Sequence, residues 1–99
     1  MAVKNLIFIK DYVGSFAENK DIARKIRIEQ IEPMLKTHTE VVLDFNGIDG
    51  ATQSFVHALI SELIRAHTSD VLDKLIFKNC TEPVRQIISI VIDYMQQID

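Results

Sequence analysis

The chain has 99 residues, a formal net charge of −3 and a pI of about 5.5. Residues 1–99 suit one domain with one hydrophobic core, and the acidic balance argues against general nucleic-acid binding. A single cysteine excludes an internal disulfide and a cysteine-rich zinc site, and it favours a reducing cytoplasm. No apolar run approaches the roughly 20 residues that a membrane-spanning helix needs, so we expect no association with a membrane.

The first part of the chain predicts a strand and then a loop. Val3 to Ile9 is apolar and too short for a stable helix, so we expect a strand there. Asp11 to Phe16 contains a glycine and a serine and predicts a turn or loop, which has room for part of a further strand. Either Ser15 or Asn19 is placed to cap the helix that follows.

A helix is predicted from Lys20 to Gln30, because its apolar residues recur on one face. Pro33 lacks a backbone N–H and crowds the preceding turn, so we expect a kink or a break near Ile31. The alternation from Ile26 to Glu29 leaves a strand as an alternative. The same helix carries a basic cluster, which predicts a solvated face rather than a nucleic-acid site: Lys20, Arg24, Lys25 and Arg27.

The best strand and a strongly amphipathic helix follow one another in the middle of the chain. Val41 to Phe45 is almost wholly apolar, as expected for a strand that is buried on both faces. Thr52 to His67 predicts a helix whose apolar residues share one broad side. We expect His57, Ser61 and Arg65 on the opposite side.

The last third of the chain predicts another strand and another helix. Leu72 to Lys78 contains the strand, and Thr81 caps a helix that runs to Gln97. This helix has surplus apolar residues, which predict packing on other elements or a contact face: Ile90, Ile92 and Tyr94. The order β-α-β-α-β-α predicts an α/β fold, a small sheet with helices packed on it. An exposed edge strand would favour dimerisation or pairing with a partner.

The turn between the central strand and its helix is the candidate site. Asn46-Gly47 and Asp49-Gly50 are strong turn signals and predict a strand-to-helix loop. We expect Thr52 to cap the helix, and the alternative is that the free amides at the helix start receive an anion. The glycines match neither a P-loop nor a dinucleotide fingerprint, which makes nucleotide binding the weaker alternative.

Other reactive side chains predict structural roles. Asp44 ends the central strand and is expected to form turn hydrogen bonds rather than a catalytic or metal site. Cys80 predicts an inert buried thiol. The histidines lack the spacing of metal ligands: His38, His57 and His67. No combination of nucleophile, base and oxyanion donors is visible, so we expect no catalysis, no cofactor and no metal.

Three segments carry a resemblance to a known family. They are Val41-Val42-Leu43-Asp44-Phe45-Asn46-Gly47-Ile48, then Thr52-Gln53-Ser54-Phe55 opening a helix, then Leu75-Ile76-Phe77-Lys78-Asn79-Cys80 before another helix. Together they resemble the STAS domain, which occurs in anti-sigma-factor antagonists and in the cytoplasmic parts of sulfate transporters. The chain is most similar to the STAS-like family of unknown function, from about Lys20 to Met95.

The resemblance implies a binding module with a regulated serine. In anti-sigma-factor antagonists, a serine at the start of the corresponding helix is phosphorylated by a histidine-kinase-like ATPase, and the unphosphorylated domain binds that partner. The family motif Asp-Ser-Ser/Thr-Gly falls on Thr52, Gln53, Ser54 and Phe55, so the aspartate and the glycine are absent and Ser54 is the phosphorylation candidate.

We therefore predict a cytoplasmic, non-catalytic protein-interaction module in signalling or transcriptional regulation. Its partner would be a histidine-kinase-like ATPase or an anti-sigma factor. The predicted partner-binding residues lie in the loop and at the helix start: Gly47, Asp49, Gly50, Thr52, Gln53, Ser54 and His57. Two alternatives are a small-ligand or nucleotide-binding domain that uses residues 46–54, and a structural homodimerisation domain.

Overall fold

Three parallel strands form the main sheet of the computed structural model, which describes residues 5–97. The strands lie in the order β1-β3-β5: β1 (Leu6–Phe8), β3 (Val41–Asp44) and β5 (Leu75–Lys78). In the register, Val42 of the central strand lies between Leu6 and Ile76. This arrangement confirms the predicted α/β class and the central position of the Val41 strand.

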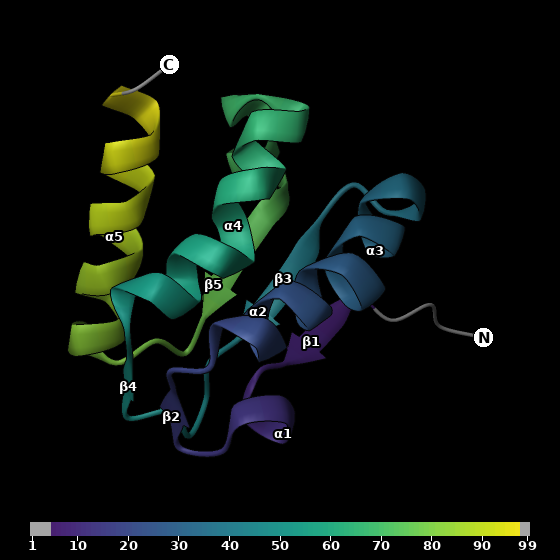
Figure 1. The fold of residues 1–99 in the computed structure, drawn as a ribbon. Helices are drawn as coiled ribbons and strands as arrows, with labels where there is room; N and C mark the ends of the chain where they lie inside the picture. The colour runs from purple at the N-terminus through teal and green to yellow at the C-terminus, as the bar shows by residue number, and fades with distance from the viewer. Residues whose placement is uncertain (1–4, 98–99) are drawn as a thin grey trace.

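The longer helices are packed on one side of this sheet, whereas the single turn α1 (Lys10–Val13) lies beyond the end of the strands, next to β2 (Phe16–Ala17) (Figure 1). The other helical segments are α2 (Lys20–Ile26), the π-helical turn η1 (Arg27–Ile31), α3 (Glu32–Thr37), α4 (Gln53–His67), the 3₁₀ helix η2 (Ser69–Lys74) and α5 (Glu82–Gln97). Figure 1 shows α4 between α2 and α5, in front of the sheet, and α4 contacts both of these helices. The apolar faces of the helices and the near face of the sheet form one buried cluster.

The two faces of the sheet differ in burial. Side chains of a strand alternate between faces, and Ile7 and Leu43 on the helical face are buried. On the other face, Leu6, Phe8 and Ile76 are 39%, 43% and 37% exposed. The sheet is therefore covered by helices on one face and open on the other.

The N-terminal segment contains more regular structure than predicted. Strand β1 is shorter than the predicted Val3 to Ile9, and Val3 lies outside the described residues. The predicted loop from Asp11 to Phe16 begins instead inside α1, which ends at Gly14 with φ +74°. One helical turn is too short to produce a periodic pattern, which is why the sequence did not indicate it.

A short second sheet lies beside the main one. Strand β2 (Phe16–Ala17) pairs in parallel with β4 (Gly50–Ala51). The predicted extra strand therefore exists, but it is separate from the main sheet. It joins the segment before α2 to the loop before α4.

The helix that follows is capped as predicted but does not break. The side chain of Asn19 accepts hydrogen bonds from the N–H groups of Asp21 and Ile22, at 2.9 and 3.2 Å. The helical path continues from α2 through η1 to Thr37, so the predicted end at Gln30 and the strand alternative are wrong. In η1 the N–H of Glu32 bonds the carbonyl five residues back. Such a wide turn gives the ring of Pro33 room. The irregularity near Ile31 is therefore a π-helical turn within a continuous helical path, where a kink or a break was expected.

Helix α4 matches the prediction except at Ser61. This side chain was expected to face solvent, but it is only 2% exposed. The reason is that α2 packs across α4, and Arg27 donates a hydrogen bond from its Nε to the carbonyl of Ala58 at 3.3 Å. The spacing of apolar residues along the helix does not indicate that a small polar residue is buried at such a crossing.

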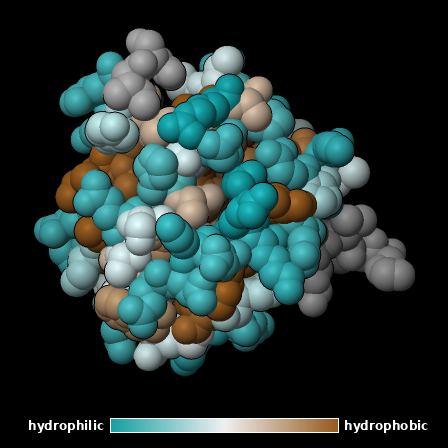
Figure 2. All heavy atoms as spheres, viewed as in Figure 1, coloured by the Kyte–Doolittle hydropathy of each residue, from teal (hydrophilic) through white to brown (hydrophobic). Residues whose placement is uncertain are grey.

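The last strand begins later than predicted, whereas the last helix begins where it was expected. The predicted strand from Leu72 starts only at Leu75, because the chain after Thr68 coils into η2. Thr81 caps α5 as predicted, and its Oγ1 accepts a hydrogen bond from the N–H of Val84 at 3.4 Å. Figure 2 shows hydrophobic atoms at the surface over α5, at the left of the view, where Ile90 and Tyr94 are exposed.

Candidate functional site

The loop between β3 and α4 begins with a turn held by Asp44. This buried carboxylate accepts hydrogen bonds through its Oδ1 from the N–H of Asn46, at 2.9 Å, and from the Nδ2 of Asn79, at 3.0 Å. The first bond closes the turn, and the second ties the loop after β3 to the loop after β5. The predicted structural role of Asp44 is confirmed.

The two glycines of this loop have different roles, one set by backbone conformation and one by packing. Gly47 has φ +84°, and a Cβ at this position would lie 2.7 Å from the Cδ of Lys10, whose side chain covers the turn. At Gly50 a Cβ would lie 2.8 Å from the ring of Phe16. Glycine therefore allows the backbone conformation at the first position and the close packing at the second.

Hydrogen bonds fix the loop to two neighbouring segments. The N–H of Asp49 donates to the carbonyl of Ser15 at 2.7 Å, and the N–H of Thr52 donates to the carbonyl of Ala17 at 2.9 Å. On the other side, the hydroxyl of Thr81 donates to the carbonyl of Asp49 at 3.4 Å. The loop is thus held between β2 and the start of α5, and it presents a fixed surface.

The start of α4 is capped as predicted. The Oγ1 of Thr52 accepts a hydrogen bond from the N–H of Phe55 at 3.2 Å. The hydroxyl of Ser54 lies 3.3 Å from the same oxygen, and its side chain is exposed. Ser54 therefore stands in the first turn of the helix, accessible from solvent.

A cavity of about 480 Å³ lies beside this first turn. It is lined by Gln53, Ser54, His57 and Ala58 of α4, by Lys20 at the start of α2, and by Val91 and Tyr94 of α5. The rings of His57 and Tyr94 have centroids 6.5 Å apart and planes tilted by 54°, a favourable arrangement for two rings. The cavity is therefore built by three helices around the predicted serine.

The structure divides the predicted residues into two groups. Three of them line the cavity: Gln53, Ser54 and His57. The others, Gly47, Asp49, Gly50 and Thr52, hold the loop and the cap. The sequence pattern did not indicate Lys20, Val91 or Tyr94 as site residues, because tertiary packing alone brings α2 and α5 to α4. The only sequence signal was the surplus apolar surface of the last helix, which included Tyr94.

The other two histidines and the cysteine do not line this cavity. The Nε2 of His67 lies 3.0 Å from a carboxylate oxygen of Glu32, and the Nδ1 of His38 lies 2.8 Å from the Thr37 hydroxyl. Burial raises the pKa of the Cys80 thiol, and Asp44 raises it further while Arg85 lowers it. A raised pKa keeps this thiol protonated near neutral pH, in its unreactive form.

Two further features concern metals and membranes. Among residues 5–97, no three histidine, cysteine or acidic side chains are grouped in a way that could hold a metal ion. Over the same residues, no helix has the length and apolar character needed to cross a membrane.

Comparison with known proteins assigns the family. The family described as a STAS-like domain of unknown function matches residues 23–85, more than half of the chain. The chain belongs to this STAS-like family. The parallel sheet with helices packed on it agrees with that assignment. The searches of curated proteins and of solved structures found no match.

The matched region of the STAS-like family contains only part of the cavity. It includes β3, the loop and all of α4, with Ser54 and His57. Lys20 lies before its first residue, and Tyr94 lies after its last. Ser54 therefore lies within the region that the family model matches. Residues before and after that region complete the lining of the cavity.

Proposed function

We propose that this STAS-like chain is a non-catalytic protein-interaction module that docks a partner protein at the start of α4. The observation that carries the proposal is the cavity there, which Ser54 and His57 line beside a loop that hydrogen bonds hold in place. A fixed, concave surface loses little conformational entropy on binding, which favours recognition of a partner. The resemblance to anti-sigma-factor antagonists supports partner switching with a histidine-kinase-like ATPase in signalling or transcriptional regulation.

Ser54 is the residue through which we propose that docking is regulated. Its hydroxyl is exposed at the second position of α4, where the helix dipole favours negative charge. A phosphate would add nearly two negative charges at the edge of the cavity that Lys20 also lines. The fold would tolerate this change, while the surface that meets the partner would differ.

Ser54→Asp tests the switch. We expect this variant to melt at the temperature of the wild type but to bind its histidine-kinase-like ATPase partner with an affinity changed about tenfold, as close charges at an interface can do. Isothermal titration calorimetry measures the affinity. Ser69→Asp, at an exposed serine that starts η2, is the matched control. Equal affinities of wild type and Ser54→Asp would reject the switch.

The cavity also favours a second candidate function, binding of a small ligand or nucleotide. Its volume of about 480 Å³ falls within the roughly 300–1,000 Å³ of small-molecule sites. A ligand that binds only the folded chain raises the melting temperature. A thermal-shift panel of nucleotides and inorganic anions measures this effect, and no shift across the panel would reject the second candidate.

A further inference from the structure

Two hollows with three lining residues in common lie side by side across the N-terminal part of α4, and we refer to them together as the groove. The cavity between α4 and α5 shares Lys20, His57 and Ala58 with a second hollow of about 270 Å³, which lies between α4 and α2. Ala58 has the smallest of these three side chains. The combined groove therefore runs from α5 across α4 to the outer side of α2.

The two ends of the groove have different chemistry. The α5 end contains Val91 and Tyr94 and is largely apolar. The α2 end contains Lys20, Arg24 and Arg27, together with the acids Asp21 and Glu62. An apolar pit that continues into a region of mixed charge suits a partner segment with one apolar side and one charged side.

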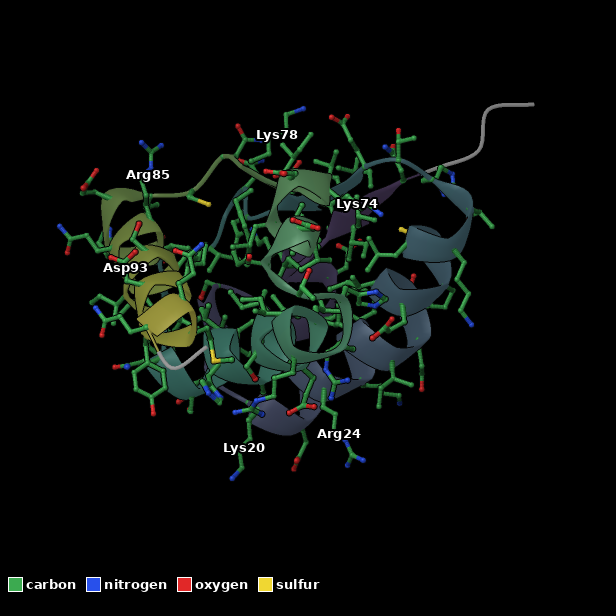
Figure 3. The ribbon with its side chains drawn as sticks, turned by 90° about the horizontal axis from the view of Figure 1, so that it is seen from above. Lys20, Arg24, Lys74, Lys78, Arg85 and Asp93 are labelled. Atoms are coloured by element: carbon green, nitrogen blue, oxygen red, sulfur yellow. The ribbon has the colours of Figure 1, made fainter. Side chains whose placement is uncertain are left out.

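Two cations at the α2 end of the groove, Lys20 and Arg24, point outward (Figure 3). Glu62 forms an ion pair with Arg65, and Arg27 is bonded to a backbone carbonyl of α4. Figure 3 shows Lys20 and Arg24 pointing away from the helices, on the side of the molecule opposite Lys78. Asp21 offsets part of their charge, but the groove remains locally cationic on a chain whose net charge is −3.

The spacing of these cations matches that of a helix. Lys20 and Arg24 are four residues apart on α2, which places them about 6 Å apart along its axis. Carboxylates four residues apart on a partner helix have the same separation. Two ion pairs could therefore form together, while an apolar side chain one or two turns away enters the cavity.

We propose that the groove binds an acidic amphipathic helix of the partner protein. A bulky apolar residue of that helix fills the cavity against Val91 and Tyr94, and its carboxylates pair with Lys20 and Arg24. This inference rests on the proposed docking function and adds the chemistry of the partner. It also predicts the direction of the switch. A phosphate on Ser54 would weaken binding of the helix, because it would repel the carboxylates and compete with them for Lys20.

Three synthetic helical peptides with one apolar face and an acidic, neutral or basic polar face test this proposal. They are titrated into the ¹⁵N-labelled full chain, and amide chemical shifts report the binding site. We expect the acidic peptide to shift the amides around the groove and to bind about tenfold more tightly than the basic one at low salt, with the difference shrinking at high salt.

Variants locate the effect within the groove. Tyr94→Ala and the double change Lys20→Glu with Arg24→Glu should each weaken the acidic peptide about tenfold, and Ser54→Asp should weaken it in the same direction. Lys36→Glu reverses an exposed charge on α3 and should leave binding unchanged. All of the altered side chains except Ser54 lie outside the helix α4, and Tyr94 is half exposed, so the fold should persist.

The opposite results would overturn the proposal. They are the absence of shifts around the groove at about 1 mM acidic peptide, equal binding of all three peptides, or unchanged binding to the double variant. Stronger shifts at the same amides with a single-stranded oligonucleotide at equal salt would assign the groove to nucleic acid instead. Because no ATPase is used, failure here leaves the Ser54→Asp test of the docking function intact.

Discussion

The carboxylate of Asp44 joins two loops at the end of the sheet where the candidate site begins. It is 5% exposed and accepts hydrogen bonds from the backbone of Asn46 and the side chain of Asn79. Asn79 has φ +60°, a conformation that asparagine tolerates better than most residues. The loop under the partner-binding surface therefore depends on a side chain that is itself too buried to contact a partner.

We expect Asp44→Ala to lower the free energy of unfolding by about 1–3 kcal/mol, because it leaves two donors in a part-buried environment without their acceptor. Asp44→Asn keeps an oxygen at that position and should lose less. Urea unfolding measures both variants, with Asp73→Ala as a control at an exposed aspartate. A loss for Asp44→Ala no larger than that of the control would contradict the role assigned to this carboxylate.

The raised pKa of Cys80 predicts that the stability of the fold depends on pH. The pKa of this thiol in the folded chain is raised above the ordinary 9.0, mainly by burial. Well below pH 9 both the folded and the unfolded chain keep the thiol protonated, and its contribution to stability is fully present. As pH rises from 9 through the folded pKa, the unfolded chain loses the proton first, so stability falls.

The variant Cys80→Ala isolates this contribution. The difference between the unfolding free energies of wild type and Cys80→Ala should be constant below pH 9 and should shift against the wild type above it. Chemical denaturation from pH 7 to pH 10.5 measures the difference. A constant difference over the whole range would show that the thiol has the same pKa in both states.

At the scale of elements, the long segments were predictable and the short ones were not. Strand β3 and helices α4 and α5 followed from apolar patterns with clear caps at Thr52 and Thr81. A single helical turn and a π-helical turn lack enough residues to show a period, so α1 and η1 were missed, and the two-residue strand β2 was expected only as part of a strand within a loop. The same limit explains the site: Ser54 and His57 lie on one helix, whereas Lys20 and Tyr94 meet them only through packing.

The crossing of α2 over α4 gives an element-scale prediction. Ser61 is buried in α4, on a helix that packs closely against α2. Ser61→Leu should lower stability by about 1–3 kcal/mol, because extra atoms in a packed interface force the helices apart. Ser61→Ala should change it less. Thermal unfolding measures both, and Ser89→Leu on the exposed side of α5 is the control. Equal stability of Ser61→Leu and the control would show that the crossing has free space.

At the scale of the whole molecule, the open face of the sheet bears on self-association. Among residues 5–97, its exposed large apolar side chains are Leu6, Phe8 and Ile76, each about two-fifths exposed. Three such side chains supply far less than the roughly 800 Å² per partner of a standard interface. We expect the chain to remain monomeric at micromolar concentrations in multi-angle light scattering. A stable dimer would favour the homodimerisation alternative and would point to a larger surface, such as that of α5.

The parallel register of the sheet has a consequence for how the chain folds. β1 joins β3 through the pair Leu6 and Val42, and β3 joins β5 through Val41 and Leu75, so each contact closes a loop of about 35 residues. Closing such loops costs chain entropy before the pairing energy is gained, whereas α4 and α5 need only local contacts. Helices should therefore form early and the sheet late. Core changes in α4 should slow refolding, while changes in β1 should mainly speed unfolding.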